Sequence, residues 1–413
     1  MEPIPLSLPI LVDGATGTEL QKRGMPVGAC TERWALDHPA ALLELQRSYV
    51  EAGADLLVVP TLGANRGMLE KFGLEDKVEE YNRSLTALTR QAADGRALVA
   101  GDLGPTGHAI PPYGQTPFEV LVGFYAEQAA ALERAGVDLF LVESVMTMAE
   151  ARAAVLGIRE AGSAKPILVT CYCDEEGRTP SGTDVLACAI VMQGMGAQAF
   201  GLNCVDPAVA EEQLTRLHQY TDLPLIAEPS AGLPDMVDGV PVYQDNAQEF
   251  ARRVPQWAAA GVRIFGGCCG TTPTHIAALR SAVGKIAYSD FPPVEKDPDV
   301  IPCASEKEAR FITPDVDVGE VIPCTSALLE DILEAEERPV GALKIAVLDT
   351  EELEIFAEEQ YAVRDALCIW SDVPELMEGA LRAYQGRAFY DGTAELEQDF
   401  LARLSEKYGL ILL

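Results

Sequence analysis

Eight short apolar runs, rich in β-branched residues, recur between residues 8 and 286 and are separated by longer segments with helical periodicity. This alternation is typical of βα units built around a parallel sheet. The runs are PILVD (9–13), DLLVVPT (55–61), RALVAGD (96–102), VDLFLVE (137–143), PILVTCY (166–172), QAFGLNC (198–204), LPLIAE (223–228) and RIFGGCC (263–269). Eight parallel strands close a barrel, and roughly 280 residues fit a (β/α)8 barrel, which typically takes ~250.

The segments between the runs carry the periodicity of amphipathic helices, as at 117–136 and 247–261. Four of the runs follow a glycine that can end the preceding helix in the left-handed conformation: Gly53, Gly136, Gly196 and Gly261. A doubly wound sheet is the alternative α/β architecture. The first turn, DGATGTEL, lacks the G-x-G-x-x-G spacing of a dinucleotide site, so the pattern favours a (β/α)8 TIM barrel over residues 1–287.

The composition changes after the barrel. Four prolines between 288 and 303 indicate a linker, and residues 304–413 contain strand-like runs (LKIAVLD, ALCIW) and amphipathic helices (373–384, 395–409) that indicate a small α/β domain. Residues 291–413 hold 28 acidic and 10 basic side chains, whereas the whole chain has a net charge of −33. The acidic surplus is therefore concentrated in this shorter region.

The same charge excludes some partners. Nucleic acids and anionic membranes are recognised by clustered Lys and Arg, and the chain has 31 of these against 64 Asp and Glu. The N-terminal segment has no basic region before its proline-broken apolar run, and no apolar stretch is long enough to cross a bilayer. We therefore expect a cytoplasmic protein, in which ten cysteines are free thiols or metal ligands rather than a disulfide framework.

In a (β/α)8 barrel the catalytic side chains lie at the carboxyl ends of the strands. Those ends carry Asp13, Thr61, Asp102, Glu143, Cys171 or Cys173, Cys204, Glu228, Cys268 and Cys269. Only one strand separates Cys204 from the Cys268–Cys269 pair, so closure of the barrel can bring three thiols to one ion, and three thiolates with an open fourth position are typical of catalytic zinc. Two alternatives remain: buried packing cysteines, or a disulfide between the neighbours in GGCCG.

Several motifs carry a specific resemblance. DGATGTEL, PTLGANRGMLEKFGLED, GDLGPTG, LVES, SGTD, GLNC, EPSAG and GGCCGTTPTHI, in this order, closely resemble the homocysteine S-methyltransferase family, as represented by the homocysteine-binding domain that begins cobalamin-dependent methionine synthases. The resemblance covers about residues 1–285. It implies that Cys204, Cys268 and Cys269 bind Zn²⁺ and that the homocysteine sulfur takes the open position, with no catalytic residue beyond this metal site.

The resemblance also suggests where the rest of homocysteine binds. Asp13 and Glu143 are expected to accept the ammonium, and backbone amides of the turn from Gly14 through Ala15 and Thr16 to Thr18 are expected to hold the carboxylate. Asn203, in GLNC, is a further expected substrate contact. Asp102 either lines the site or braces its loop, whereas Cys171 and Cys173 are interpreted as packing residues.

The chain departs from the family at Pro60 and Ser230, where relatives usually carry asparagine, so substrate hydrogen bonding can differ there.

The resemblance leaves the methyl donor open. ALRAYQGRAFYDG and LARLSEKYGLILL resemble part of a folate-binding barrel, although about 120 residues cannot form a second eightfold barrel, and the cobalamin motif D-x-H-x-x-G is absent from the sequence. We therefore expect methylcobalamin on a separate corrinoid protein, with a folate or other methyl-transfer subunit as a further partner. The alternatives are S-methylmethionine or betaine as a small donor, and a non-enzymatic scaffold subunit of a corrinoid complex.

Overall fold

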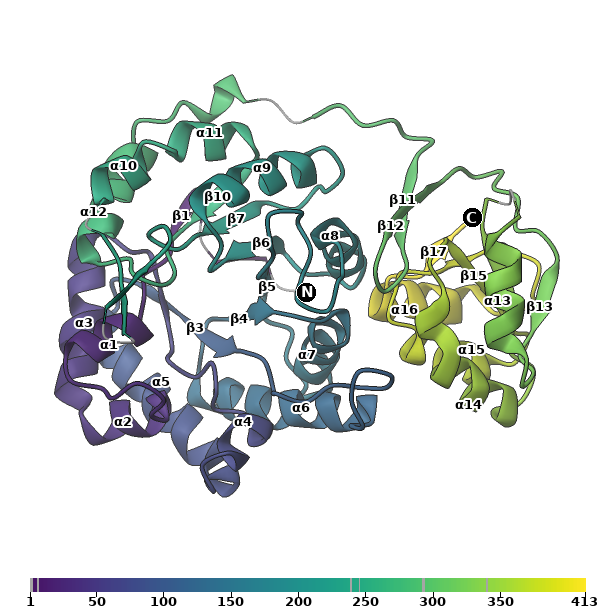
Figure 1. Cartoon of the computed structure of the whole chain (residues 1–413), viewed down its shortest axis with the longest axis horizontal. Coiled ribbons are helices and arrows are strands. Elements are labelled where there is room, and N and C mark those ends of the chain that lie inside the picture. Colours follow the sequence, from purple (N-terminus) through teal and green to yellow (C-terminus); the bar gives the residue numbers. More distant parts are fainter. Residues whose placement is uncertain (1–2, 6, 238–239, 245, 292–293, 339–340) are drawn as a thin grey trace.

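Eight parallel strands curl into one barrel, which occupies the larger part of the molecule (Figure 1). The computed structural model describes residues 3–5, 7–237, 240–244, 246–291, 294–338 and 341–413. The strand order is β1-β10-β7-β6-β5-β4-β3-β2, and a parallel bridge between Val12 and Leu56 joins the two outer strands. The strands are β1 Ile10–Leu11, β2 Leu56–Val58, β3 Leu98–Leu103, β4 Leu139–Val145, β5 Ile167–Cys171, β6 Ala199–Asn203, β7 Leu225–Glu228 and β10 Val262–Phe265. The predicted barrel is confirmed, with one strand in each predicted run.

The interior of the barrel is filled by one aliphatic side-chain cluster rather than by a channel. Its members come from all eight strands and are at most 2% exposed: Ile10, Val12, Leu56, Ala100, Leu139, Leu141, Leu168, Ala199, Ile226 and Ile264. Alternate residues of a strand point to opposite faces, so the neighbouring positions face the surrounding helices instead. This packing fixes the strand ends that carry the polar residues.

Helices surround the barrel: α1 Gly17–Lys22, α2 Thr31–Asp37, α3 Pro39–Ala52, α4 Arg66–Glu70, α5 Val78–Ala93, α6 Phe118–Ala135, α7 Met148–Glu160, α8 Val185–Gly194, α9 Pro207–His218, α10 Ala247–Ala251, α11 Val254–Ala259 and α12 Pro273–Val283. The helix predicted over 247–261 divides in two, and Pro255 lies in the first turn of the second helix, where its missing amide hydrogen costs no helical bond. All four predicted stop glycines have φ between 82° and 103°. Among the described residues, none of the helices has the length and apolarity that crossing a bilayer requires.

The region after the barrel contains two further sheets. β11 Ile301–Ala304 and β12 Ala309–Ile312 form an antiparallel hairpin, which begins inside the stretch interpreted above as a linker. A five-stranded parallel sheet follows, in sequential order: β13 Val321–Pro323, β14 Leu343–Ala346, β15 Leu367–Trp370, β16 Phe389–Tyr390 and β17 Ile411–Leu412. The helices α13 Leu328–Glu336, α14 Thr350–Glu359, α15 Pro374–Ala383 and α16 Gln398–Tyr408 connect its strands.

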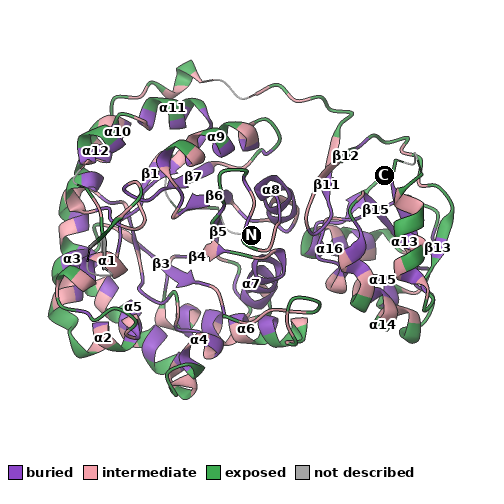
Figure 2. Ribbon diagram, in the orientation of Figure 1, coloured by how far each residue is buried: buried purple, intermediate pink, exposed green. Residues whose placement is uncertain are grey.

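Helices α7 and α8 lie between the barrel and the C-terminal region and are buried on nearly every face (Figure 2). The sequence of α8, VLACAIVMQG, is apolar all round, as expected of a helix packed on both sides. Within α7, the fully buried Arg152 donates to the carbonyl oxygens of Leu381 (2.8 Å) and Arg382 (3.3 Å) at the end of α15. The C-terminal region is thus docked against the flank that carries β4, β5 and β6.

Two further short strands, β8 Asp235–Val237 and β9 Val240–Val242, form a second hairpin between β7 and α10.

Candidate functional site at the carboxyl ends of the barrel strands

A cavity of about 430 Å³ opens at the carboxyl ends of the barrel strands. Its walls come from the ends of seven of the eight strands or the loops that follow them, which places residues far apart in sequence around one space. At the strand ends the lining includes three cysteines (Cys204, Cys268 and Cys269) and four carboxyl groups (Asp13, Asp102, Glu143 and Glu228), and Cys30 and Glu32 at the start of α2 line it as well. This convergence of sulfur and oxygen ligands is the chemical signature of the site.

The Sγ atoms of the three cysteines lie within 4.8 Å of one another. The Sγ of Cys269 is 3.3 Å from that of Cys204 and 4.0 Å from that of Cys268. Sulfurs bound tetrahedrally to zinc at ~2.3 Å are about 3.8 Å apart, and the two distances from Cys269 lie on either side of this value. Among the described residues, these three form the one group of cysteine, histidine or carboxylate ligands with metal-binding spacing.

Backbone hydrogen bonds hold the thiols in place. The Cys204 amide donates to the carbonyl of Glu228 (3.1 Å), and the Cys268 amide donates to that of Pro229 (2.9 Å), so the ends of β6, β7 and β10 are joined. Cys204 has a φ of 58°, a left-handed conformation that a non-glycine residue rarely adopts. Such a conformation persists only where the surrounding structure imposes it, and here it directs the thiol toward the pair from β10.

Cys204 and Cys268 are paired as a disulfide across 64 residues of sequence. The disulfide considered from the sequence, between the neighbours Cys268 and Cys269, is therefore not the one observed. Cys269 carries a free thiol, whose pKa is raised by burial and, secondarily, by the charge of Glu143.

The turn after β1 is fastened to the cysteine loop. Thr271 accepts a hydrogen bond at Oγ1 from the Ala15 amide (3.1 Å) and donates from the same hydroxyl to the Cys268 carbonyl (2.7 Å). The Tyr49 hydroxyl donates to the Ala15 carbonyl at 2.7 Å. A Cβ on Gly14 would lie 2.9 Å from the Tyr49 ring and hydroxyl, so this close approach requires glycine.

The carboxyl groups of Asp13, Asp102 and Glu228 are buried and that of Glu143 is partly exposed. When ionised, these four groups repel one another. Burial is the main cause that raises the pKa of Asp13, Asp102 and Glu228 well above their ordinary values, and the nearby Glu143 adds to it. Burial also raises the pKa of Glu143 to about 7, opposed by hydrogen bonds with Asn203 and Asp102. A cation bound beside these carboxyl groups would favour their ionised form and so oppose the effect of burial.

Asn203 organises the end of β4. Its side-chain nitrogen donates to Glu143 Oε1 (2.9 Å) and to Ser144 Oγ (2.7 Å), and its side-chain oxygen accepts from the Ser144 amide (3.2 Å). Ser144 has a φ of 59°, so this network holds a strained residue beside Glu143. The same nitrogen lies 3.9 Å from Cys268 Sγ, which connects the carboxylate wall to the thiols.

The structure brings most of the predicted site residues together. Asp13, Gly14, Ala15, Thr16, Glu143 and the three cysteines all line the cavity, and Asn203 supports it from behind. Asp102 lines the cavity too, and its Oδ1 has no hydrogen-bond partner in the described part of the chain. Pro60 also lines it, whereas Ser230 is buried with its amide bonded to the Val205 carbonyl.

Some contributors were not assigned from the sequence. Glu228 was named among the strand-end residues, but it was given no role there, and it lines the cavity. Thr271 and Tyr49 act through contacts that exist only after the barrel closes, and Tyr49 carries the pattern of an ordinary helix core residue. Cys171 and Cys173 are buried outside the cavity lining, as packing residues.

Comparison with known proteins identifies relatives of the barrel. The profile of the homocysteine S-methyltransferase family matches residues 10–283. The methionine synthase of Mycobacterium leprae (strain TN) is 31% identical over 302 residues, which cover 69% of this chain and 25% of that protein. The methionine synthase of Mycobacterium tuberculosis (strain ATCC 25618 / H37Rv) is 31% identical over 292 residues, which cover 66% and 24%. The chain thus spans about a quarter of the length of the curated relatives it matches.

Solved structures give the same picture. The metallated form of the homocysteine methyltransferase MmuM from Escherichia coli superimposes with a TM-score of 0.57 at 28% identity, over 66% of this chain and 95% of that one. The oxidized form of the same enzyme gives a TM-score of 0.56 at 27% identity with the same coverage. The similarity therefore spans nearly the whole of a single-barrel methyltransferase.

Proposed function

Because this chain belongs to the homocysteine S-methyltransferase family, we propose that it transfers a methyl group to the sulfur of homocysteine and forms methionine. The observation that carries the proposal is the cavity in which three cysteines lie beside the carboxyl groups of Asp13, Asp102, Glu143 and Glu228, of which all but that of Glu143 are buried. The reaction needs a thiolate at neutral pH and a binding site for an amino acid. The cysteines of this cavity suit the first need, and its carboxyl groups suit the second.

We propose Cys204, Cys268 and Cys269 as the ligands of a zinc ion. Their spacing suits Zn²⁺, and soft sulfur ligands select it over Mg²⁺ or Ca²⁺. Cys204 and Cys268 have to be in the reduced state for this role. When bound, Zn²⁺ would keep the homocysteine sulfur deprotonated at neutral pH, although a free thiol titrates near ~8.5. The metallated form of the E. coli relative supports this assignment.

The amino-acid end of homocysteine would bind on the carboxyl wall. Ionised Glu143 and Asp13 attract its ammonium group, and Asn203 fixes the direction in which Glu143 points. The carboxylate would lie against the turn from Gly14 to Thr18. Since the Ala15 amide already donates to Thr271, the neighbouring amides of this turn are the ones that would hold the carboxylate.

For the methyl donor we propose methylcobalamin carried by a separate corrinoid protein. The loops after six barrel strands expose large apolar side chains around the mouth: Val27, Leu62, Phe72, Tyr113, Met146, Tyr172, Leu233, Met236 and Val242. We call this set the apolar rim. Exposed apolar surface that surrounds a polar site is typical of protein docking, and a small donor would not require it.

A small cationic donor, S-methylmethionine or betaine, is the second candidate. One observation favours it: the cavity is also lined by the buried carboxyl group of Glu32, which accepts hydrogen bonds from the Gly63 amide (2.8 Å) and the Cys30 thiol (3.3 Å). An additional buried carboxyl group would attract a sulfonium or ammonium donor. Burial raises the pKa of Glu32, so this attraction is weaker than that of a fully ionised carboxylate.

A donor assay tests the proposal. Reduced, zinc-loaded protein is incubated with homocysteine and with methylcobalamin, S-methylmethionine or betaine, and methionine is quantified by mass spectrometry. Methionine formed from methylcobalamin supports a corrinoid methyl donor. Turnover with the sulfonium or ammonium donors alone would overturn it in favour of a small donor. Failure of all three donors, together with no calorimetric binding of homocysteine, would overturn the methyltransferase function for this chain.

We further propose that the C-terminal region resembles a fragment of a folate-binding barrel. Its five parallel strands follow each other in sequence and in the sheet, which is the order of consecutive βα units in a barrel.

A further inference from the structure

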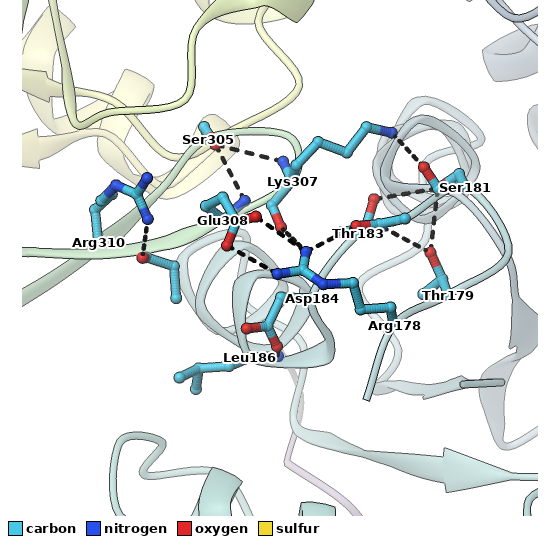
Figure 3. A network of polar contacts seen from close by, with 12 residues as sticks. Arg178, Thr179, Ser181, Thr183, Asp184, Leu186, Ser305, Lys307, Glu308 and Arg310 are labelled. Carbon is cyan, nitrogen blue, oxygen red and sulfur yellow. Dashed lines mark hydrogen bonds and ion pairs between the residues drawn. The ribbon is translucent and has the colours of Figure 1, made fainter. Parts of the chain in front are cut away.

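The tip of the β11–β12 hairpin, residues 305–308, packs against the loop 172–184 that follows barrel strand β5 (Figure 3). The Asp184 amide donates to the Lys307 carbonyl at 2.9 Å. Arg178 forms an ion pair with Glu308 at 3.0 Å, and the Lys307 ammonium donates to the Ser181 carbonyl at 2.9 Å. A segment outside the barrel therefore contacts one of the loops at the catalytic mouth.

Lys307 reaches a second mouth loop as well. Its Nζ lies 4.5 Å from the centroid of the Tyr113 ring, in the loop after β3, and 2.7 Å from Glu306 Oε1. The Lys307 side chain is 18% exposed and that of Glu306 is 6% exposed, so this ion pair is largely shielded from water and weakly screened. One ammonium group thus joins the loops after β3 and β5.

The loop after β5 is in turn bonded to the end of β4. The Tyr172 amide donates to the Val145 carbonyl (3.2 Å) and the Ser181 amide to the Met146 carbonyl (3.4 Å). None of the described residues of 109–116 or 172–184 lines the cavity itself. These loops carry Tyr113 and Tyr172 of the apolar rim, and their partner Met146 belongs to it too.

We propose that Lys307 is a positioning residue for the apolar rim: it holds the loops after β3 and β5 together, so that the C-terminal region shapes the surface on which the corrinoid protein that carries methylcobalamin docks. The donor part of this inference rests on the proposed function. The mechanical part, that Lys307 restrains two mouth loops, stands independently of it and is measured without any substrate.

Hydrogen–deuterium exchange of the full chain tests the mechanical part. Lys307→Met removes the ammonium but keeps the length of the side chain, and it should speed exchange in 109–116 and 172–184 by about tenfold, the effect of losing one charged hydrogen bond. Lys307→Arg should restore protection. Lys296→Met is the matched control, because Lys296 pairs with Asp222 in a loop at the opposite end of the barrel. Unchanged exchange in both loops of Lys307→Met would overturn the inference.

Kinetics test the donor part. In Lys307→Met the KM of the methyl donor should rise by about threefold to tenfold, since a cation–π contact and a hydrogen bond are lost, while the KM of homocysteine stays within about twofold. If both KM values rise equally, or only kcat falls, the rim is not the surface that Lys307 controls. Because Lys307→Met leaves Glu306 unpaired, the Glu306→Gln, Lys307→Met double variant should show the same split with a wild-type Tm. If the wild-type protein forms no methionine, the proposed function is contradicted. The hydrogen–deuterium exchange result would still decide whether Lys307 positions the two loops.

Discussion

The side-chain amide of Asn203, at the end of β6, donates a 2.9 Å hydrogen bond to the carboxylate of Glu143, near the end of β4. This bond spans the end of β5, which lies between these two strands, and Asn203 itself has no exposed surface. Through Ser144 the same amide also fixes a left-handed backbone position. The orientation of Glu143 therefore depends on a residue 60 positions further along the chain.

Replacing Asn203 by leucine should weaken homocysteine binding. The substitution removes the hydrogen bonds that Asn203 donates to Glu143 and Ser144, so the Glu143 carboxylate is no longer held in place. Unsatisfied buried polar groups cost about 1–3 kcal/mol, and we expect the Kd of homocysteine to rise by roughly tenfold or more. Isothermal titration calorimetry of the reduced, zinc-loaded protein measures this. Gln193→Leu, which alters a polar contact at the far end of α8, serves as the control. An unchanged Kd in Asn203→Leu would contradict the role given to this bond.

The buried Glu143 should give the folded protein an unusual pH dependence. Its pKa is raised by burial to about 7, whereas an exposed glutamate titrates near 4.5, so between these values the folded state holds a proton that the unfolded state has lost. The free energy of unfolding therefore falls as pH rises through this window, by about 1.4 kcal/mol for each unit of pKa shift. At pH 4 this penalty is nearly absent, at pH 5 about a quarter of it has developed, and above pH 7 it is nearly complete.

Urea unfolding of wild type and Glu143→Gln between pH 5 and pH 8 checks the sign. The wild type should lose stability relative to the variant as pH rises. Homocysteine affinity should behave oppositely, strengthening in the wild type as Glu143 ionises near pH 7 and remaining weak in the variant. Parallel stability curves would show that Glu143 ionises without penalty.

Much of the architecture could be predicted because its signals are local. The eight apolar runs and the four stop glycines are read from neighbouring residues, and strand ends of a parallel barrel must meet at one mouth. Tyr49 and Thr271 could not be assigned, because both bond to Ala15, which lies 34 residues from Tyr49 and 256 residues from Thr271 in the sequence. The hairpin after the barrel was not predicted, because its prolines indicated a linker. Pro302 lies within β11, and a two-stranded ribbon tolerates a residue without an amide hydrogen.

The zinc content of cysteine variants should distinguish the three proposed zinc ligands from the buried packing cysteines. Cys204→Ser, Cys268→Ser and Cys269→Ser should each lower zinc from about one per chain toward zero at sub-micromolar free zinc, because a site with two thiolates loses most of its affinity. Cys173→Ser is the control, since Cys173 is buried outside the cavity. Inductively coupled plasma mass spectrometry of reduced, dialysed protein gives the stoichiometry. Full zinc content in Cys269→Ser would remove that residue from the ligand set.

Arg152 should hold the C-terminal region against the barrel. Burial lowers its pKa to about 10, but it remains charged at neutral pH and donates to the Leu381 and Arg382 carbonyls and to Gln385 Oε1 (3.3 Å). Arg152→Met leaves those acceptors unsatisfied and should cost about 2 kcal/mol, with exchange in α15 increasing before that of the barrel. Arg403→Met, on the exposed face of α16, should leave both measurements unchanged. If Arg152→Met unfolds at the same urea concentration as wild type, the three hydrogen bonds only offset the cost of burying the guanidinium, and other contacts hold the two regions together.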